Sequence, residues 1–216
     1  MELKKVKVHT GKPKGDSYYN NVARNYEVKR KKQAWWHTEQ DEMKVLLDKL
    51  PEGLGVVDIP FGTGRFVSMY LEKGYDVSGL DASGDMISAA KRILGDDFKK
   101  VDVRVGDASS LPYDADEFDL LVSTRFLRDI VSYRTAKKVL REFSRVTKQY
   151  AIIQLGQNRQ EGFIPDDESP MRGSLSETGV HKLLKENRFE VIEKRLVLSH
   201  ENEGTDIYHF LCKKDT

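Results

Sequence analysis

The sequence predicts an α/β fold: an open sheet that is mostly parallel, ends in an antiparallel hairpin and has helices on both faces. Two observations predict it. From about residue 50 onward, short runs of β-type residues alternate with segments of helical periodicity, a pattern typical of right-handed βαβ crossovers. The last two strand-like runs are instead joined by a short polar turn at 199–206. That turn leaves no room for a crossover helix, so the pair is predicted to be antiparallel.

Each element follows from its local pattern. Helices are predicted where apolar residues recur at intervals of three and four, in the segments 38–50, 64–73, 84–94, 134–148 and 176–187. The last helix has Ser174 or Ser176 as its N-cap. Strands are predicted in the β-rich runs 55–59, 76–80, 101–105, 120–123, 150–155, 190–198 and 207–213.

Length and composition indicate one domain with a basic extension. The chain has 216 residues, of which 38% are hydrophobic, enough for a sizeable core. The net charge is only +1, but residues 1–34 hold ten Lys and Arg against three acids. We therefore expect residues 1–50 to be a basic N-terminal arm with lid helices. Residues 51–216 are expected to form the core.

The same composition excludes several classes of protein. No apolar run approaches the roughly 18 residues that a membrane-spanning helix needs, and the first residues lack the apolar stretch of a secretory signal. The single cysteine, Cys212, excludes an internal disulfide and a multi-cysteine zinc site. We expect a cytoplasmic protein without a membrane span, and no metal site is predicted.

Three acids stand at the ends of successive predicted strands. Asp58 stands near the end of the first strand, Asp81 directly follows the second and Asp107 comes two residues after the third. Between the first two lies a turn containing Gly62 and Gly64, where the absence of a Cβ lets the backbone approach a ligand closely. In α/β sheets ligands bind beyond the carboxyl ends of the strands, and an acid there can accept hydrogen bonds from ribose hydroxyls. Any one acid could instead cap a helix, but all three together favour a site for a nucleoside with a short charged tail.

These segments resemble the class I S-adenosylmethionine-dependent methyltransferases, whose core is a Rossmann-like sheet. The segment Asp58-Ile-Pro-Phe-Gly-Thr-Gly64 matches their first motif, and Gly79-Leu-Asp81 matches the ribose-binding acid. Gly106-Asp107-Ala108 matches the adenine-binding stretch. The resemblance covers about residues 18–213 and is greatest to the small type 11/25 enzymes. Two residues depart from it: Pro60 stands where glycine is commonest and Phe61 where cysteine is frequent, which suggests a stiffer loop.

The resemblance implies a role for each matching residue. Asp81 would bind the ribose, Asp107 and Ala108 the adenine, and Gly62 and Gly64 the methionine portion. The full set implied to contact the cofactor is Tyr18, Tyr26, Trp36, Asp58, Pro60, Gly62, Thr63, Gly64, Asp81, Ala82, Met86, Gly106, Asp107, Ala108 and Thr124. Substrate contacts are expected from Tyr19, Arg125 and Phe126. The aromatic residues of the arm could equally serve only to pack the arm onto the core.

The expected activity is methyl transfer from S-adenosylmethionine, which leaves S-adenosylhomocysteine. Alignment and exclusion of water can supply much of the acceleration, and no catalytic residue stands out. His37, Asp129 and His181 are weak candidates for a base. Tyr133 and Lys137 have the spacing of the short-chain dehydrogenase pair, but the third glycine of a dinucleotide motif is absent after Gly64.

The methyltransferase hypothesis leaves several classes of methyl acceptor to consider. The sequence has neither the Pro-Pro-aromatic run of enzymes that methylate base amines nor the Pro-Cys pair that attacks pyrimidine rings, so DNA is not expected. We favour a small-molecule acceptor, with RNA or protein, recruited by the basic arm, as the alternative. A methyltransferase-like binding or regulatory module without catalysis also remains open.

Overall fold

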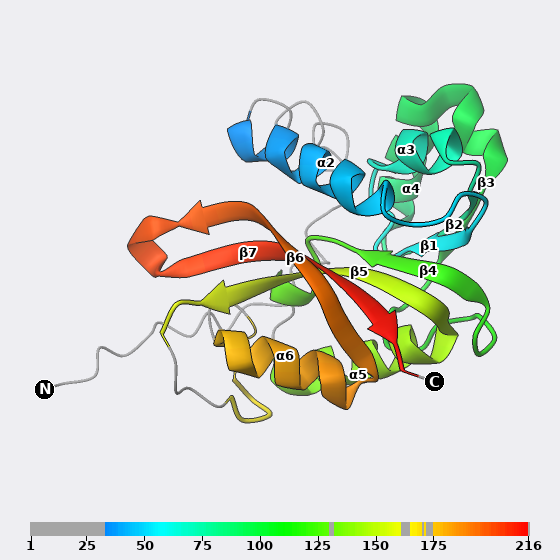
Figure 1. Cartoon of the computed structure of the whole chain (residues 1–216). Coiled ribbons are helices and arrows are strands. Elements are labelled where there is room, and N and C mark those ends of the chain that lie inside the picture. Colours follow the sequence, from blue (N-terminus) through cyan, green and yellow to red (C-terminus); the bar gives the residue numbers. More distant parts are fainter. Residues whose placement is uncertain (1–32, 130–131, 161–164, 170, 172–174, 216) are drawn as a thin grey trace, which may run out of the picture.

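The computed structural model describes residues 33–129, 132–160, 165–169, 171 and 175–215. They form a seven-stranded sheet of order β3-β2-β1-β4-β5-β7-β6 (Figure 1). The strands are β1 Gly55–Asp58, β2 Asp76–Asp81, β3 Val101–Val105, β4 Phe118–Ser123, β5 Thr147–Asn158, β6 Phe189–His200 and β7 Thr205–Lys214. The helices are α2 Ala34–Leu47, α3 Val67–Glu72, α4 Gly84–Leu94, α5 Tyr133–Val146 and α6 Glu177–Glu186, with short 3-10 turns at Gly95–Lys100, Leu127–Asp129 and Glu201–Glu203.

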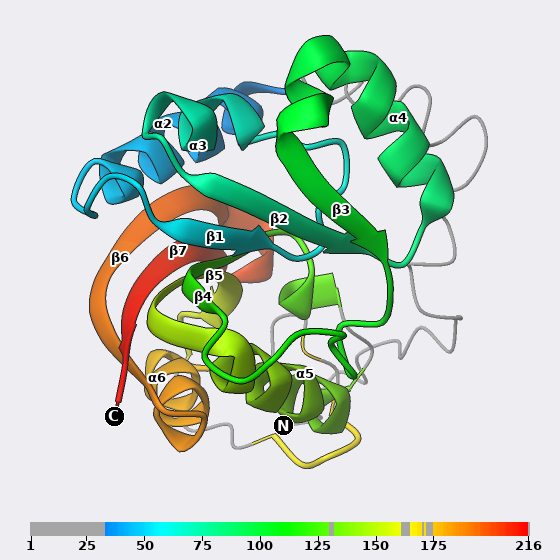
Figure 2. The ribbon, with the colours of Figure 1, turned by 90° about the vertical axis from the view of Figure 1, so that its right-hand side faces the viewer.

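The helices cover both faces of the sheet, as predicted. Helices α2, α3 and α4 lie on one face, and α5 and α6 lie on the other (Figures 1 and 2). Successive side chains along each strand point to opposite faces of the sheet, so each face has its own apolar core. In β1, Val56 packs with α2 and α3, whereas Val57 faces the cluster that contains α5 and α6. No helix among the described residues is long and apolar enough to cross a membrane.

The strand pairings confirm the predicted topology. Strands β1 to β5 are mutually parallel, and β6 pairs antiparallel with β7. Strand β7 also pairs antiparallel with β5, with Gln154 opposite His209. The last strand of the chain is therefore inserted between β5 and β6, and it carries the sheet past the end of its parallel part.

Helix and strand ends differ from the predictions where tertiary contacts decide them. Helix α4 has the predicted bounds because Ser83 caps its first turn, accepting from the Met86 amide at 3.3 Å. The prediction of a helix from residue 64 is wrong at its start, since Gly62 and Gly64 have φ of +58° and +70° and helical backbone needs negative φ. Strands β5, β6 and β7 are longer than predicted, because cross-strand pairing extends them through polar residues.

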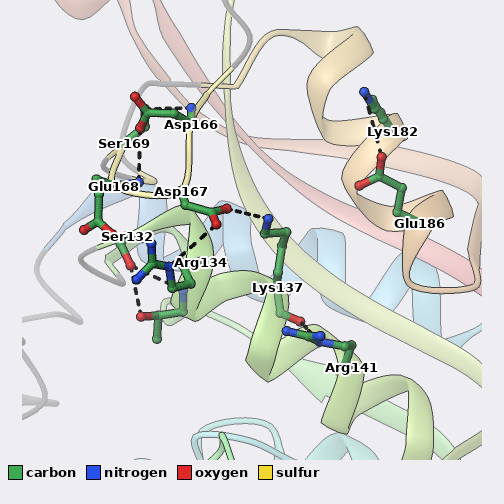
Figure 3. A network of polar contacts seen from close by, with 11 residues as sticks. Ser132, Arg134, Lys137, Arg141, Asp166, Asp167, Glu168, Ser169, Lys182 and Glu186 are labelled. Carbon is green, nitrogen blue, oxygen red and sulfur yellow. Dashed lines mark hydrogen bonds and ion pairs between the residues drawn. The ribbon is translucent and has the colours of Figure 1, made fainter.

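A polar clip holds the loop between β5 and α6 against the start of α5 (Figure 3). The Tyr133 amide donates to the Ser169 carbonyl at 2.9 Å, and the Arg134 amide donates to the Asp167 carbonyl at 3.0 Å. Lys137 forms an ion pair with the Asp167 carboxylate. Tyr133 and Lys137, the pair with dehydrogenase-like spacing, therefore belong to this clip.

Candidate functional site

The glycine turn after β1 lies at the carboxyl edge of the sheet, between β2 and β4. The Ile59 amide donates to the Val122 carbonyl of β4 at 2.9 Å, and the Phe61 amide donates to the Leu80 carbonyl of β2 at 2.8 Å. Pro60, between them, follows a cis peptide bond and is partly buried. Hydrogen bonds to both neighbouring strands therefore fix where the turn begins.

The absence of a Cβ at two glycines makes room for Phe61, one of the two residues that depart from the family pattern. A Cβ on Gly79 of β2 would lie 2.2 Å from the Phe61 ring, and a Cβ on Gly64 would lie 3.1 Å from it. The ring is 2% exposed. Phe61 therefore fills the space between Gly64 of the turn and Gly79 of β2.

Asp81 connects the glycine turn to the second strand. Its Oδ2 accepts from the Gly62 amide and its Oδ1 from the Ser83 amide, both at 2.8 Å. Burial raises the pKa of this carboxyl above its ordinary value, although the hydrogen bonds from Ser83 and Gly62 oppose that effect. A carboxylate has further lone pairs, so Asp81 can still accept hydrogen bonds from a bound ligand.

Asp58 is more deeply buried, at 2% exposure, and its Oδ2 accepts from the Tyr70 hydroxyl at 3.2 Å. Burial raises the pKa of this carboxyl well above the ordinary value; the Tyr70 hydrogen bond lowers it, the Asp81 charge raises it and Arg65 lowers it. The resemblance to the methyltransferases implies that Asp58 also orients the glycine turn, and this role stays a prediction.

The third strand brings its predicted residues to the same edge. The Gly106 amide donates to the Asp81 carbonyl at 3.1 Å, which places the start of the 106–108 segment beside β2. Ala108 is buried, but Asp107 is exposed and its oxygens accept from the amide and hydroxyl of Ser109 at 2.8 and 2.9 Å. Asp107 thus accepts hydrogen bonds within a local turn rather than capping a helix.

Two further predicted residues lie near the turn. The methyl end of Met86 lies 3.7 Å from the position that a Cβ on Gly62 would take, and its side chain is 5% exposed. Ala82, between Asp81 and the N-cap Ser83, is exposed. The structure therefore brings the β1, β2 and β3 candidates together at one edge.

The end of β4 supplies the other predicted wall. Thr124 is 8% exposed, and Arg125 and Phe126 are partly buried. Arg125 has a φ of +58°, a left-handed conformation that is uncommon for a residue with a Cβ and often marks functional sites. Its guanidinium lies over the Trp35 ring, with Cζ 4.2 Å from the ring centroid.

A buried polar network that the sequence did not reveal lies beside this wall. Glu39 of α2 is 1% exposed. It accepts hydrogen bonds from Arg65, which follows the glycine turn, and from the side-chain amide of Gln154 on β5. Gln154 Oε1 in turn accepts from the Arg125 amide at 2.9 Å. Trp36, a predicted cofactor contact, takes part through its carbonyl, which accepts from Arg65 Nη2 at 2.8 Å.

The charge of Glu39 is maintained by its partners. Burial alone would raise its pKa, but the guanidinium groups of Arg65 and Arg125 bring the pKa below its ordinary value. Arg125 Nη1 lies 4.0 Å from Glu39 Oε2. A carboxylate that shares two guanidinium neighbours stays ionised in a site that excludes water.

His209 of β7 lies against the same carboxylate. It is fully buried, and burial lowers its pKa to about 4 although the Glu39 charge opposes the shift. The imidazole of His209 also interacts with the backbone of Glu39. Among the described residues, however, neither ring nitrogen has a partner at hydrogen-bond geometry. His209 is therefore a neutral imidazole at neutral pH. Only the pairing of β5 with β7 brings it beside Gln154.

Three of the predicted site residues, Tyr18, Tyr19 and Tyr26, lie outside the described residues. Their assignment to a lid or to the acceptor, like the division between arm and core, stays a prediction.

Comparisons with known proteins agree with the architecture. Residues 56–150 match the sequence profile of the family described as a methyltransferase domain. The demethylmenaquinone methyltransferase of Renibacterium salmoninarum is 36% identical over 96 residues, which are 44% of this chain and 38% of that protein. The demethylmenaquinone methyltransferase of Halalkalibacterium halodurans is 30% identical over 158 residues, 68% of this chain and 58% of that protein. The chain thus spans less than two thirds of the length of either relative.

Solved structures show the same fold at low sequence identity. The cyclase SpnF superposes with a TM-score of 0.71 at 15% identity, covering 85% of this chain and 84% of that one. The 1,6-didemethyltoxoflavin-N1-methyltransferase of Burkholderia thailandensis, which contains 1,6-didemethyltoxoflavin and S-adenosylhomocysteine, superposes with a TM-score of 0.65 at 16% identity, covering 98% and 94%. Residues 56–150 therefore match a methyltransferase domain, and the chain has the same fold as a solved methyltransferase that binds S-adenosylhomocysteine.

Proposed function

We propose that this protein transfers a methyl group from S-adenosylmethionine to a small-molecule acceptor. The observation that carries the proposal is the position of Asp81. Its carboxylate is held by the Gly62 and Ser83 amides, 2.8 Å from each, at the edge where the glycine turn and β2 meet. An acid in this position can accept from the hydroxyls of a ribose.

The surrounding residues fit the cofactor. Gly62 and Gly64 adopt positive φ, which allows the tight turn after β1, and Asp81 and Asp107 stand at neighbouring strand ends. Asp81 would hold the ribose, Asp107 and Ala108 the adenine, and Gly62 and Thr63 the methionine portion. Met86, packed against Gly62, would flank the base.

When bound, the cofactor supplies an electrophilic methyl group on a sulfonium sulfur. The chain's own contribution is to align the acceptor with that group and to exclude water. Thr124, Arg125 and Phe126 are the proposed acceptor wall, because the end of β4 adjoins β1 in the sheet. His209 is buried and neutral, and we assign no proton transfer to it.

The proposal of a small-molecule acceptor rests on the compounds for which the relatives are named. The curated relatives are named for demethylmenaquinone and the Burkholderia structure for a didemethyltoxoflavin, and neither compound is a nucleic acid or a protein. RNA or protein, drawn by the basic arm, is the second possibility. A cyclase shares the fold, so the fold alone does not imply methyl transfer.

Calorimetric titration with S-adenosylmethionine and S-adenosylhomocysteine tests the cofactor site. We expect micromolar binding, and a loss of at least about tenfold in Asp81→Ala. Asp76→Ala is the matched control, since Asp76 is exposed at the opposite end of the same strand. Equal affinity in the wild-type protein and Asp81→Ala would refute the assignment of Asp81. No binding by the folded wild-type protein would refute the proposed function.

Transfer of a labelled methyl group then identifies the acceptor class. The panel contains demethylmenaquinone, 1,6-didemethyltoxoflavin, total RNA and unfolded protein. Label in the small molecules alone is the expected result. Label in RNA or protein would replace the proposed acceptor, and cofactor binding without transfer to any of them would favour the binding module.

A further inference from the structure

We propose that Gln154 and Glu39 are positioning residues of the methyl-transfer site, which act by holding the backbone of Arg125 in its left-handed conformation. The inference rests on the proposed function, because the end of β4 is its acceptor wall. It concerns two buried residues that no sequence motif contains, on β5 and α2. Gln154 contacts the wall through a hydrogen bond from the Arg125 amide, and Glu39 contacts it through an ion pair with the Arg125 guanidinium.

The geometry is a relay of three contacts. The Arg125 amide donates to Gln154 Oε1 at 2.9 Å. The Gln154 amide group donates to Glu39 Oε1, and Glu39 Oε2 accepts from Arg65. Glu39 and Gln154 are each 1% exposed, so no water replaces these bonds. A glutamine side chain fixed at both ends of its amide has no freedom to rotate.

The relay opposes the backbone preference of Arg125. A residue with a Cβ disfavours a φ of +58°, and such a conformation persists only where the surroundings determine it. The hydrogen bond from the Arg125 amide to Gln154 fixes the peptide plane before Arg125, and the contacts of the guanidinium with Glu39 and Trp35 fix the side chain after it, so together they determine φ. With that peptide plane held, an ordinary negative φ would turn the Arg125 side chain away from Glu39 and Trp35.

The same relay joins the acceptor wall to the cofactor side. Arg65 follows the glycine turn, and Arg125 Nη1 lies 4.0 Å from the oxygen that Arg65 contacts. Helix α2 carries Glu39 into this position and also places Trp35 against the Arg125 guanidinium. The carboxylate of Glu39 therefore connects the turn after β1, through Arg65, with the end of β4, through Arg125.

The test compares Gln154→Leu with Gln149→Leu, the same change at the exposed amino end of β5. Gln154→Asn is a milder second variant, which keeps an amide but withdraws it by one methylene. Three quantities are measured: exchange of the Arg125 amide hydrogen by NMR, S-adenosylhomocysteine affinity by calorimetry, and kcat and KM for methyl transfer to the panel acceptor that the wild-type protein methylates fastest.

We expect Gln154→Leu to speed Arg125 amide exchange at least about tenfold and to lower kcat about 10- to 100-fold. The affinity for S-adenosylhomocysteine should change less than about twofold, because Gln154 contacts none of the proposed ribose or adenine ligands. Gln154→Asn should show smaller changes in the same direction, and Gln149→Leu none. The combination of lower kcat with unchanged cofactor affinity distinguishes positioning from a general loss of structure.

Unchanged Arg125 exchange in Gln154→Leu would overturn the proposal whether or not the protein is an enzyme. Faster exchange with wild-type kcat would also overturn it, since the relay would then be purely structural. Should Gln154→Leu fail to fold, Gln154→Asn decides by the same criteria. A wild-type protein that binds no S-adenosylhomocysteine would instead refute the proposed function, and the catalytic role of the relay with it.

Discussion

At the scale of single residues, the polar groups of the site divide by how far apart their partners lie in the sequence. Asp81 lies 19 residues from Gly62 and two from Ser83, in successive βα turns, and the sequence pattern identified Asp81 and Gly62. Glu39 and Gln154 are 115 residues apart. No local spacing connects them, because their contact exists only once α2 packs across β5 and β7.

His209 should make the stability of the protein depend on pH. Its pKa is lowered from 6.5 to about 4 in the folded chain, so between these values the unfolded chain binds the additional proton. Stability therefore rises as pH rises through this window, and roughly 3 kcal/mol is lost as pH falls from 6.5 to about 4. We expect His209→Phe, which cannot titrate, to lack this component.

Urea unfolding at pH 4 to 7 measures the effect, with His37→Phe, exposed near the start of α2, as the control. Both variants retain Asp58, whose raised pKa contributes an opposite slope above 3.8, so the difference between the curves reports His209 together with its coupling to Glu39. Parallel curves for the wild-type protein and His209→Phe would show that the buried imidazole is not the cause.

At the scale of elements, local sequence signals succeeded where a cap or a turn is decided by neighbouring residues. Helix α4 has its predicted bounds, between the Ser83 cap and Gly95 with a φ of +57°. Of the two serines that could cap α6, Ser176 is the cap, accepting from the Gly179 amide at 3.2 Å. The predicted start of α3 was wrong, because the backbone conformation of Gly62 and Gly64 depends on contacts with β2 and β4.

The Ser176 cap gives a prediction at this scale. Ser176→Ala should lower the free energy of unfolding by about 1 kcal/mol, since it leaves a helix amide without its acceptor. Ser88→Ala, at an exposed position within α4, is the matched change away from a cap. The two are compared by urea denaturation, and equal stabilities would contradict the cap's contribution.

At the scale of the whole molecule, the hairpin completes both the sheet and the site. Strand β7 lies between β5 and β6, where it buries Phe210 and Leu211 on opposite faces and places His209 beside Glu39. The chain's last strand is therefore internal to the sheet, although it comes last in the sequence.

A chain that ends at Gly204 should therefore fail to fold. Each large apolar side chain removed with β7 contributes about 1.5–3 kcal/mol, and Ile207, Phe210 and Leu211 are each at most 4% exposed. Their combined loss is comparable to the 5–15 kcal/mol that stabilises an ordinary domain. A chain that ends at Asp215 is the control. A cooperative thermal transition in the shorter chain would show that β7 is dispensable.

By itself the sequence determined the α/β class, the antiparallel hairpin and the residues at the ends of β1, β2 and β3, because periodicity, turn residues and short motifs act over a few residues. The tertiary structure alone decided the insertion of β7 between β5 and β6, the left-handed backbone at Arg125 and the buried contact of Glu39 with Gln154. These features depend on which strands pair and which helix covers them. They arise from burial and hydrogen bonding between segments far apart in the chain, which no local pattern records.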